Sequence, residues 1–178
     1  MTHLRLETER LVLRPLTLRD LDDMASLLGD AEALTFWGSP LDREGARDWI
    51  QRNLHRYETD GVGRCAVVLR ATGELIGDCG LIRTLVEGSQ ETELGWIVRR
   101  SHWGKGIATE AGAAWRDHAF DNLGIDRIVS MISEANAASR RVAEKLGMTI
   151  ERKAMWGGLP HLMYSLRPGV LDRRTDQR

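Results

Sequence analysis

A glycine-containing turn in the second half of the chain has the residue types of an anion-binding loop. Its residues are Trp103, Gly104, Lys105, Gly106, Ile107, Ala108 and Thr109. The turn precedes a helical pattern, and the first N–H groups of a helix lack intrahelical partners and lie at the positive end of the helix dipole. Glycine lets the backbone approach a phosphate without a Cβ clash, and Lys105 adds a positive charge. The loop therefore predicts a pyrophosphate site; the alternative is a turn that needs glycine only for its backbone conformation.

Two well-known phosphate-binding motifs do not fit this turn. A dinucleotide-binding fingerprint places an acid about 20 residues beyond the loop, at the end of the next strand. Asp126 has that spacing from Gly106, but it precedes the strand predicted at 127–132, and Thr109 stands where the third glycine belongs. The chain also contains no Gly-x-x-x-x-Gly-Lys-Ser/Thr sequence, which excludes a P-loop.

The elements before the loop are predicted from apolar periodicity and from turn residues. Strands are expected at 10–14, 65–69, 75–82 and 91–98. Two helices are expected between the first two strands. One begins with the capping box of Thr17 and Asp20, and the other with Ser39 as N-cap and Pro40 as its first residue. The turn at 71–74 joins the second and third strands into an antiparallel hairpin.

The elements after the loop complete an α/β (α+β) pattern. Helices are expected at 106–123 and 139–146, and strands at 127–132, 148–155 and 162–166. Gly147 is the expected C-cap of the second of these helices. The order β-α-α-β-β-β-α-β-α-β-β predicts a mixed sheet with helices on its faces. We expect one domain over 1–166 and a flexible tail over 167–178.

Composition narrows the classes of partner. The chain has 178 residues, 25 of them basic and 26 acidic, so we expect no nucleic acid as main partner. No apolar run approaches the roughly 20 residues that a membrane helix needs. Residues 1–10 are too polar for a secretion signal, which predicts a cytoplasmic protein that does not bind membranes. Two cysteines, Cys65 and Cys79, predict reduced thiols rather than a disulfide framework, and no metal site is expected.

Four short segments between residues 6 and 166 carry a family resemblance. They are 6–14, the strand Glu93-Leu94-Gly95-Trp96 with the loop that follows it, Asn136-x-x-Ser139, and 144–148. Together they resemble the GNAT acetyltransferase superfamily, and within it the RimJ/RimL-like branch of protein N-acetyltransferases. The superfamily's Gln/Arg-x-x-Gly-x-Gly/Ala signature aligns with 103–108. Trp103 departs from its first position, but an aromatic-Trp-Gly-x-Gly form is common in the RimJ/RimL-like branch.

The resemblance implies a mostly antiparallel GNAT-like sheet with helices on both faces and a coenzyme A site in an opening between central strands. The loop amides would bind the pyrophosphate of the coenzyme. A backbone N–H of Trp96 or Ile97 would point at the thioester carbonyl, and Ile97 and Val98 would pair their backbone with the pantetheine arm. Arg141 and its basic neighbours on the same helix would meet the 3′-phosphate; the alternative is a solvated helix face.

The resemblance also implies catalytic roles. Glu93 is the first candidate for the base that takes a proton from the acceptor amine, and Glu91, on the same strand face, is the second. The alternative for Glu93 is a surface glutamate. Ser139 would hydrogen-bond or protonate the leaving sulfur, and Asn136 would fix the coenzyme arm, whereas both residues are also ordinary helix N-caps. Many relatives use a tyrosine as the acid one turn later, where this chain has Ala143.

The expected acceptor site lies near three tryptophans. Trp37, Trp96 and Trp156 fall in segments that border the acceptor cleft in relatives, although packing in the core is the alternative for each. Glu91 is assigned to the same acceptor side. The resemblance thus implies transfer of an acetyl group from acetyl-CoA to a primary amine, on a protein N-terminus or a small molecule, by direct attack in a ternary complex. The alternative is an acyl-CoA sensor without turnover. Monomer and homodimer both remain open.

Overall fold

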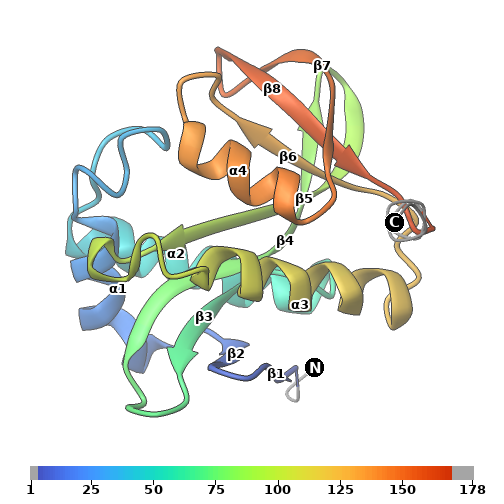
Figure 1. The fold of residues 1–178 in the computed structure, drawn as a ribbon. Helices are drawn as coiled ribbons and strands as arrows, with labels where there is room; N and C mark the ends of the chain where they lie inside the picture. The colour runs from blue at the N-terminus through green and yellow to red at the C-terminus, as the bar shows by residue number, and fades with distance from the viewer. Residues whose placement is uncertain (1–3, 170–178) are drawn as a thin grey trace.

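A single eight-stranded sheet forms the centre of the computed structural model, which describes residues 4–169 (Figure 1). Its strands are β1 (Leu6–Glu7), β2 (Leu11–Pro15), β3 (Arg64–Leu69), β4 (Leu75–Val86), β5 (Ser89–Val98), β6 (Ile128–Ile132), β7 (Thr149–Trp156) and β8 (Leu159–Leu166). The spatial order is β1-β2-β3-β4-β5-β6-β8-β7, and every neighbouring pair is antiparallel except β5–β6. The predicted mixed, mostly antiparallel sheet is confirmed.

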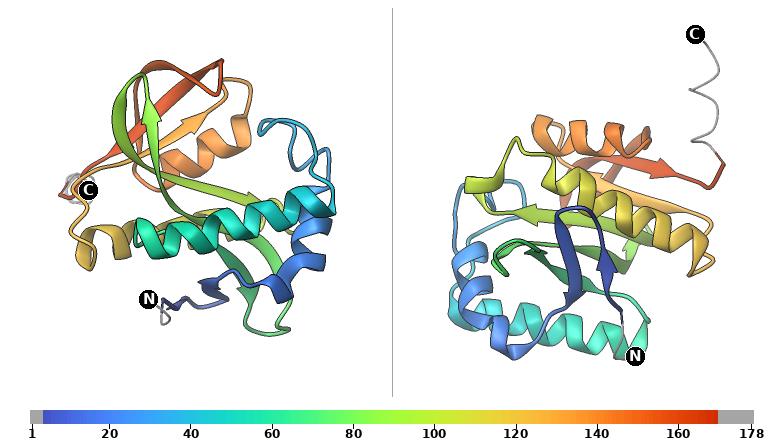
Figure 2. Two further views of the ribbon diagram at one scale, coloured as in Figure 1. Left: turned by 180° about the vertical axis from the view of Figure 1, so that it is seen from behind. Right: turned by 60° about the horizontal axis from the view of Figure 1, so that its bottom comes forward.

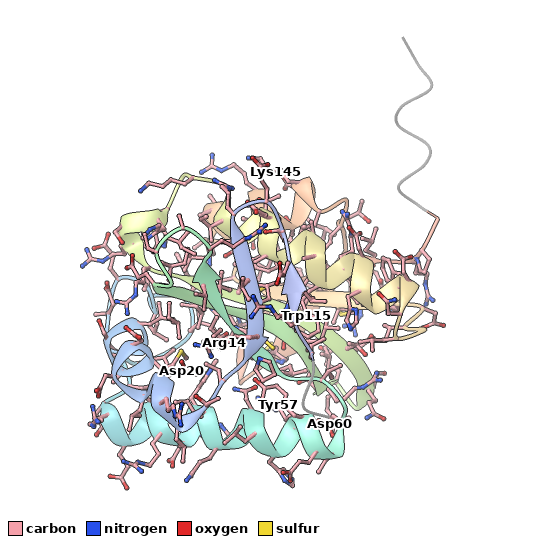
Figure 3. All side chains as sticks on the ribbon, turned by 90° about the horizontal axis from the view of Figure 1, so that it is seen from below. Arg14, Asp20, Tyr57, Asp60, Trp115 and Lys145 are labelled. Atoms are coloured by element: carbon pink, nitrogen blue, oxygen red, sulfur yellow. The ribbon has the colours of Figure 1, made fainter. Side chains whose placement is uncertain are left out.

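Four helices cover the two faces of this sheet. They are α1 (Leu21–Leu28), α2 (Arg43–Thr59), α3 (Ile107–Asp121) and α4 (Ala137–Lys145), with short 3₁₀ turns η1 (Leu18–Asp20) and η2 (Arg100–His102). Helices α3 and α4 lie on one face, and α1 and α2 lie on the other (Figures 1 and 2). Trp115 of α3 is fully buried against the sheet, and Arg14 of β2 points at Asp20 of η1 (Figure 3).

The two central strands pair only briefly. The parallel ladder between β5 and β6 consists of one pair, Glu93 with Val129, and Ser130 Oγ donates a hydrogen bond to the Leu94 carbonyl at 2.6 Å. Beyond this point β5 stays paired with β4 as far as Val98, while β6 turns away from it (Figure 1). The predicted opening between central strands therefore begins directly after Glu93.

Several predicted boundaries need correction. The second helix begins at Arg43 rather than after Ser39, because the Asp42 side chain caps it by accepting a hydrogen bond from Gly45 N–H at 2.8 Å. Strand β1 was not predicted, since two residues show no periodicity. Strand β4 continues to Val86 in a long hairpin with β5, and Val86 packs in a small apolar cluster with residues of β6, β7 and β8. Helix α4 begins two residues earlier than expected, with Asn136 as its N-cap.

Other local predictions are confirmed. Thr17 and Asp20 form the expected capping box, and Gly147 adopts a positive φ of 86° after α4. Cys65 and Cys79 are buried free thiols. Among residues 4–169, no helix is both long and apolar enough to cross a lipid bilayer. The tail predicted at 167–178 lies mostly outside the described residues.

Candidate active site at the opening between β5 and β6

The predicted anion-binding loop forms one end of a cavity of about 500 Å³. Gly104 and Gly106 have positive φ values of 73° and 76°, and Gly106 is the N-cap of α3 without any side-chain cap. The first helical hydrogen bond runs from Glu110 N–H to the Gly106 carbonyl at 3.0 Å. The N–H groups of residues 107–109 therefore have no partner within the helix and are available to an anion.

Most of the predicted coenzyme residues line this cavity. They are Trp96, Ile97, Val98, Trp103, Gly104, Gly106, Ile107, Ala108, Thr109, Asn136 and Arg141. Lys105 is not among the lining residues, because its ammonium group donates a hydrogen bond to the Ser101 carbonyl at 2.8 Å. Lys145 and His102 also line the cavity, and its positive side chains among the described residues, Arg141 and Lys145, both come from α4.

The N-terminal hairpin holds the loop in place. The Glu110 carboxylate accepts hydrogen bonds from Thr8 Oγ1 at 2.5 Å, Arg10 N–H at 3.0 Å and Arg10 Nε at 2.6 Å. Arg10 Nη1 in turn donates to the Lys105 carbonyl at 2.9 Å. Sequence reasoning assigned these residues no role beyond a motif of the resemblance. Their contact with the loop follows from the fold, which brings together segments about a hundred positions apart.

The backbone of β5 presents alternate groups to the opening. The carbonyls of Leu94 and Val98 accept hydrogen bonds from Ser130 and the Trp103 indole, so they face away from β4. Arg99 N–H points toward β4, where it donates to the Ile76 carbonyl at 2.8 Å. By strand alternation, the backbone groups of Trp96 face the opening, whereas those of Ile97 face β4.

A smaller cavity of about 30 Å³ lies beside the larger one and contains Glu93. Five residues line both cavities: Phe36, Trp37, Trp96, Asn136 and Ser139. The two spaces therefore meet at Ser139. Trp156 lines the smaller cavity but not the larger one. The smaller cavity thus brings together Glu93, Ser139 and the three predicted tryptophans.

Glu93 is the one titratable side chain among the described residues that line the smaller cavity. It is 3% exposed, and its Oε2 has no hydrogen-bond partner within residues 4–169. Burial raises the pKa of Glu93 to about 7, against the opposing influence of the Arg64 charge and the Met131 N–H. A carboxyl group with a pKa near neutrality is suited to accept and release protons at neutral pH.

Glu91 lies elsewhere. Its carboxylate oxygens accept hydrogen bonds from Arg127 Nε at 3.0 Å and Arg127 Nη2 at 3.2 Å. Arg127 also pairs with Glu151 at 2.7 Å. Glu91 lines neither cavity, although it shares a strand face with Glu93. The alternation of the strand predicted the face, but not the distance of Glu91 from the opening.

Phe36 and Ser130 are among the residues of the smaller cavity that the sequence did not predict. Phe36 comes from the segment between α1 and α2, which has no periodic pattern. Ser130 lies on β6, where it had no feature to distinguish it from other strand residues. No local signal in the sequence marks either position, because each reaches the site only through the packing of its element.

At the start of α4, only one of the two predicted cap residues caps the helix with its side chain. Asn136, which was predicted at a helix start, accepts a hydrogen bond at Oδ1 from Ser139 N–H at 3.0 Å. The amide side chain is therefore the cap. This arrangement leaves the Ser139 hydroxyl free of a capping role, at the point where the two cavities meet.

Comparison with known proteins agrees with this geometry. Residues 10–149 match the family model of the acetyltransferase (GNAT) domain. The chain is 32% identical to an uncharacterized N-acetyltransferase, p20, of Bacillus licheniformis over 82% of this chain and 83% of that protein. It is also 32% identical to an acetyltransferase of Agrobacterium tumefaciens of known crystal structure, with a TM-score of 0.82 over 94% of this chain and 96% of that one.

A more distant structure shows the same fold. RimJ of Mycobacterium smegmatis, solved in complex with CoA-disulfide, is 20% identical, with a TM-score of 0.76 over 92% of this chain and 84% of that one. The family match covers most of the chain, and a relative above 30% identity spans over four fifths of it. The protein belongs to the GNAT family of N-acetyltransferases.

Proposed function

We propose that the protein transfers an acetyl group from acetyl-CoA to a primary amine by direct attack in a ternary complex. The observation that carries the proposal is the position of Glu93. Its buried carboxylate, with one oxygen that has no partner among the described residues, lies in a small cavity that meets the larger one at Ser139. A base on one side of a junction and an anion-binding loop on the other are what acetyl transfer requires.

The larger cavity has the residues to hold coenzyme A. Its volume of about 500 Å³ is typical of a cofactor site, and an uncapped helix N-terminus lies at one end. Arg141 and Lys145 line the same cavity and are suited to a terminal phosphate. RimJ of Mycobacterium smegmatis, which shares the fold, was solved with CoA-disulfide. The bound coenzyme supplies the activated acetyl thioester.

The chain's own groups then divide the work. The Glu93 carboxylate accepts the proton of the acceptor amine, directly or through water, so that the nitrogen can attack. The Trp96 N–H, which alternation directs into the opening, donates to the oxyanion that develops on the thioester carbonyl. The Ser139 hydroxyl donates to the departing sulfur. Glu91 has no part in this proposal, because Arg127 holds its carboxylate. We further propose that the protein acts in the cytoplasm and that it belongs to the RimJ/RimL-like branch of the family.

The acceptor side of the site favours an amine with one positive charge. Glu93 is the only carboxylate of the smaller cavity within the described residues, and the other walls include Phe36, Trp37 and Trp156. Carboxylates in the segments around it are already paired: Glu32 with Arg100 at 2.6 Å, Glu134 with Lys153 at 2.9 Å and Glu87 with Arg152 at 2.5 Å. A second ammonium group on the acceptor would find no free counter-charge there.

A panel of amines tests both the activity and this preference. Each amine is incubated with acetyl-CoA, and the thiol released is measured against a blank. We expect kcat/KM to be higher for simple alkylamines and for peptides whose first residue has an uncharged side chain than for spermidine and an aminoglycoside. The expected difference is about 10- to 100-fold, which corresponds to the cost of leaving one ammonium group unpaired near the site. The reverse order would contradict the acceptor assignment. Coenzyme binding without thiol release for any amine would favour the sensor.

Replacing Ser139 with alanine separates its two roles. The helix cap depends on the Asn136 side chain and the backbone N–H at 139, so the melting temperature is expected to stay unchanged. The loss of a donor to the sulfur is expected to lower kcat by about 10-fold or more while the KM for the amine changes little. A matched Asn136→Ala variant should instead lower the melting temperature. Full kcat in Ser139→Ala would assign the protonation of the sulfur to water.

A further inference from the structure

Arg64 is a buried cation with an unusual environment. It is 2% exposed, and its Nε donates to Asp78 Oδ1 at 2.6 Å, while Asp78 Oδ2 accepts a hydrogen bond from Trp49 Nε1 at 2.9 Å. A buried ion pair is weak evidence for stability, because desolvation offsets its attraction. The pair therefore needs an explanation other than stability.

The sheet has a passage for the Arg64 side chain. In the strand register, Arg64 of β3 lies opposite Gly80 of β4, and Gly80 lies opposite Gly95 of β5. A Cβ atom at Gly95 would come within 1.8 Å of Arg64 Nη1, so no other residue fits there while the guanidinium keeps its place. The side chain thus crosses β4 and reaches the face of β5.

The guanidinium also supports a wall of the acceptor cavity. Its central carbon lies 4.8 Å from the centre of the Trp37 ring, over the face of the indole. Trp37 lines both cavities, and it packs edge-on against Trp49 with ring centres 6.4 Å apart. Arg64 therefore contacts the site through Trp37 without lining it.

Two buried polar atoms in this layer have no partner among the described residues, Arg64 Nη2 and Glu93 Oε2. Glu93 and Gly95 are two positions apart on β5, so they face the same side of the sheet. An unpaired donor of a cation and an unpaired oxygen of a carboxylate thus lie in one water-poor layer. The charged groups facing Glu93 are Arg64 from β3 and Arg56 from α2, with Asp78 of β4 behind Arg64.

We infer that Arg64 is a positioning residue for the base: its guanidinium favours the ionised form of the buried Glu93 carboxyl group, which accepts the proton, and holds Trp37 as a wall of the acceptor site. The inference rests on the proposed function of Glu93. The guanidinium does not touch the reacting atoms; it acts through the charge of Glu93 and the position of the indole. The influence of Arg64 on the Glu93 pKa is downward, opposite to that of burial, which agrees with this role.

The direction of the expected effect follows from the charges. Loss of the cation leaves burial to act with less opposition, so the pKa of Glu93 rises above its value of about 7. The base form is then present only at higher pH, and the acidic limb of the kcat/KM profile moves toward alkaline pH. A change of fold or packing alone would lower activity at every pH without moving that limb.

The principal test is Arg64→Met combined with Asp78→Asn, because this double variant removes the ion pair without leaving an unpaired charge. The acidic limb is expected to move up by about one pH unit or more, which lowers kcat/KM roughly tenfold on that limb. Arg64→Lys, which retains the charge, should restore most of the profile. Arg14→Met with Asp20→Asn removes a less buried Arg–Asp pair, between β2 and η1, and should leave the limb in place.

A direct titration keeps the test independent of turnover. The carbon-13 resonance of the Glu93 carboxyl, assigned by its loss in Glu93→Gln, is followed against pH in the wild-type chain and in the Arg64 variants. A higher midpoint in Arg64→Met with Asp78→Asn supports the inference even if no amine is acetylated, in which case the proposed function alone fails. Midpoints that coincide with the wild type, with folding verified by thermal melting, would overturn it.

Discussion

Replacing Glu93 with glutamine is expected to lower kcat/KM for the best amine by roughly 10²- to 10⁴-fold, the usual contribution of a general base. Glutamine has the same shape but cannot accept the proton. The buried position makes the substitution mild for the fold, since the amide needs no ion partner. The dissociation constant of coenzyme A is expected to stay the same, because Glu93 does not line the larger cavity.

The pH dependence gives this expectation a second readout. The pKa of Glu93 is raised from 4.5 to about 7, so the wild-type kcat/KM should fall below about pH 7 as the carboxyl is protonated. The residual activity of Glu93→Gln should lack this limb. The raised pKa also means that the native carboxyl resists ionisation. Because its pKa is higher in the folded than in the unfolded chain, the protonated Glu93 adds to the free energy of unfolding. This contribution is complete below the unfolded pKa and is lost as the pH rises through about 7.

The matched control for this variant is Glu91→Gln. It removes a carboxylate from the same strand face, but one that Arg127 holds outside both cavities. We expect kcat/KM and its acidic limb to stay close to the wild type in Glu91→Gln. Thermal melting at pH 9 should show Glu93→Gln at least as stable as the wild type, since no buried carboxylate must ionise. A Glu93→Gln enzyme with wild-type kcat/KM would remove Glu93 from the mechanism.

Replacing Gly106 with alanine is expected to raise the KM for acetyl-CoA by roughly 10- to 100-fold, the cost of one or two lost hydrogen bonds to a charged group. Gly106 has a φ of 76° as the N-cap of α3. Alanine is strained there, and a rotation that relieves the strain would re-aim the N–H groups of residues 107–109. At saturating acetyl-CoA, kcat should fall much less than kcat/KM, because Glu93 and Ser139 keep their places.

Gly73→Ala provides the matched control for backbone strain. Gly73 has a φ of 74° in the turn between β3 and β4, a Cβ atom there would meet no other group within 4 Å, and the residue lines neither cavity. Both alanine variants should lose a similar amount of stability in thermal melting. Only Gly106→Ala should weaken coenzyme binding, measured by isothermal titration with coenzyme A. Equal binding by the two variants would remove the loop amides from the coenzyme site.

The parts of the site that could be predicted from the sequence are those with local causes. Gly104 and Gly106 before a helical pattern indicate free amides, because the geometry of a helix start depends only on nearby residues. The capping box at Thr17 and the glycine with positive φ at the end of α4, Gly147, were predictable for the same reason. The order of strands and helices likewise follows from periodicity, although the start of α2 was misplaced, since Ser39-Pro40 and Asp42 offer competing caps a few residues apart.

By itself, the sequence determined the type of fold, the anion-binding loop and a short set of candidate bases. Only the tertiary structure decided between Glu93 and Glu91, because burial, an unpartnered oxygen and the nearby Arg64 depend on which strands and helices pack around each carboxylate. It also decided that Arg10 supports the loop through Glu110, a contact across a hundred positions of the chain. The desolvation of a carboxyl group and the charges near it depend on the residues packed around it, so they cannot be predicted from a short segment of sequence.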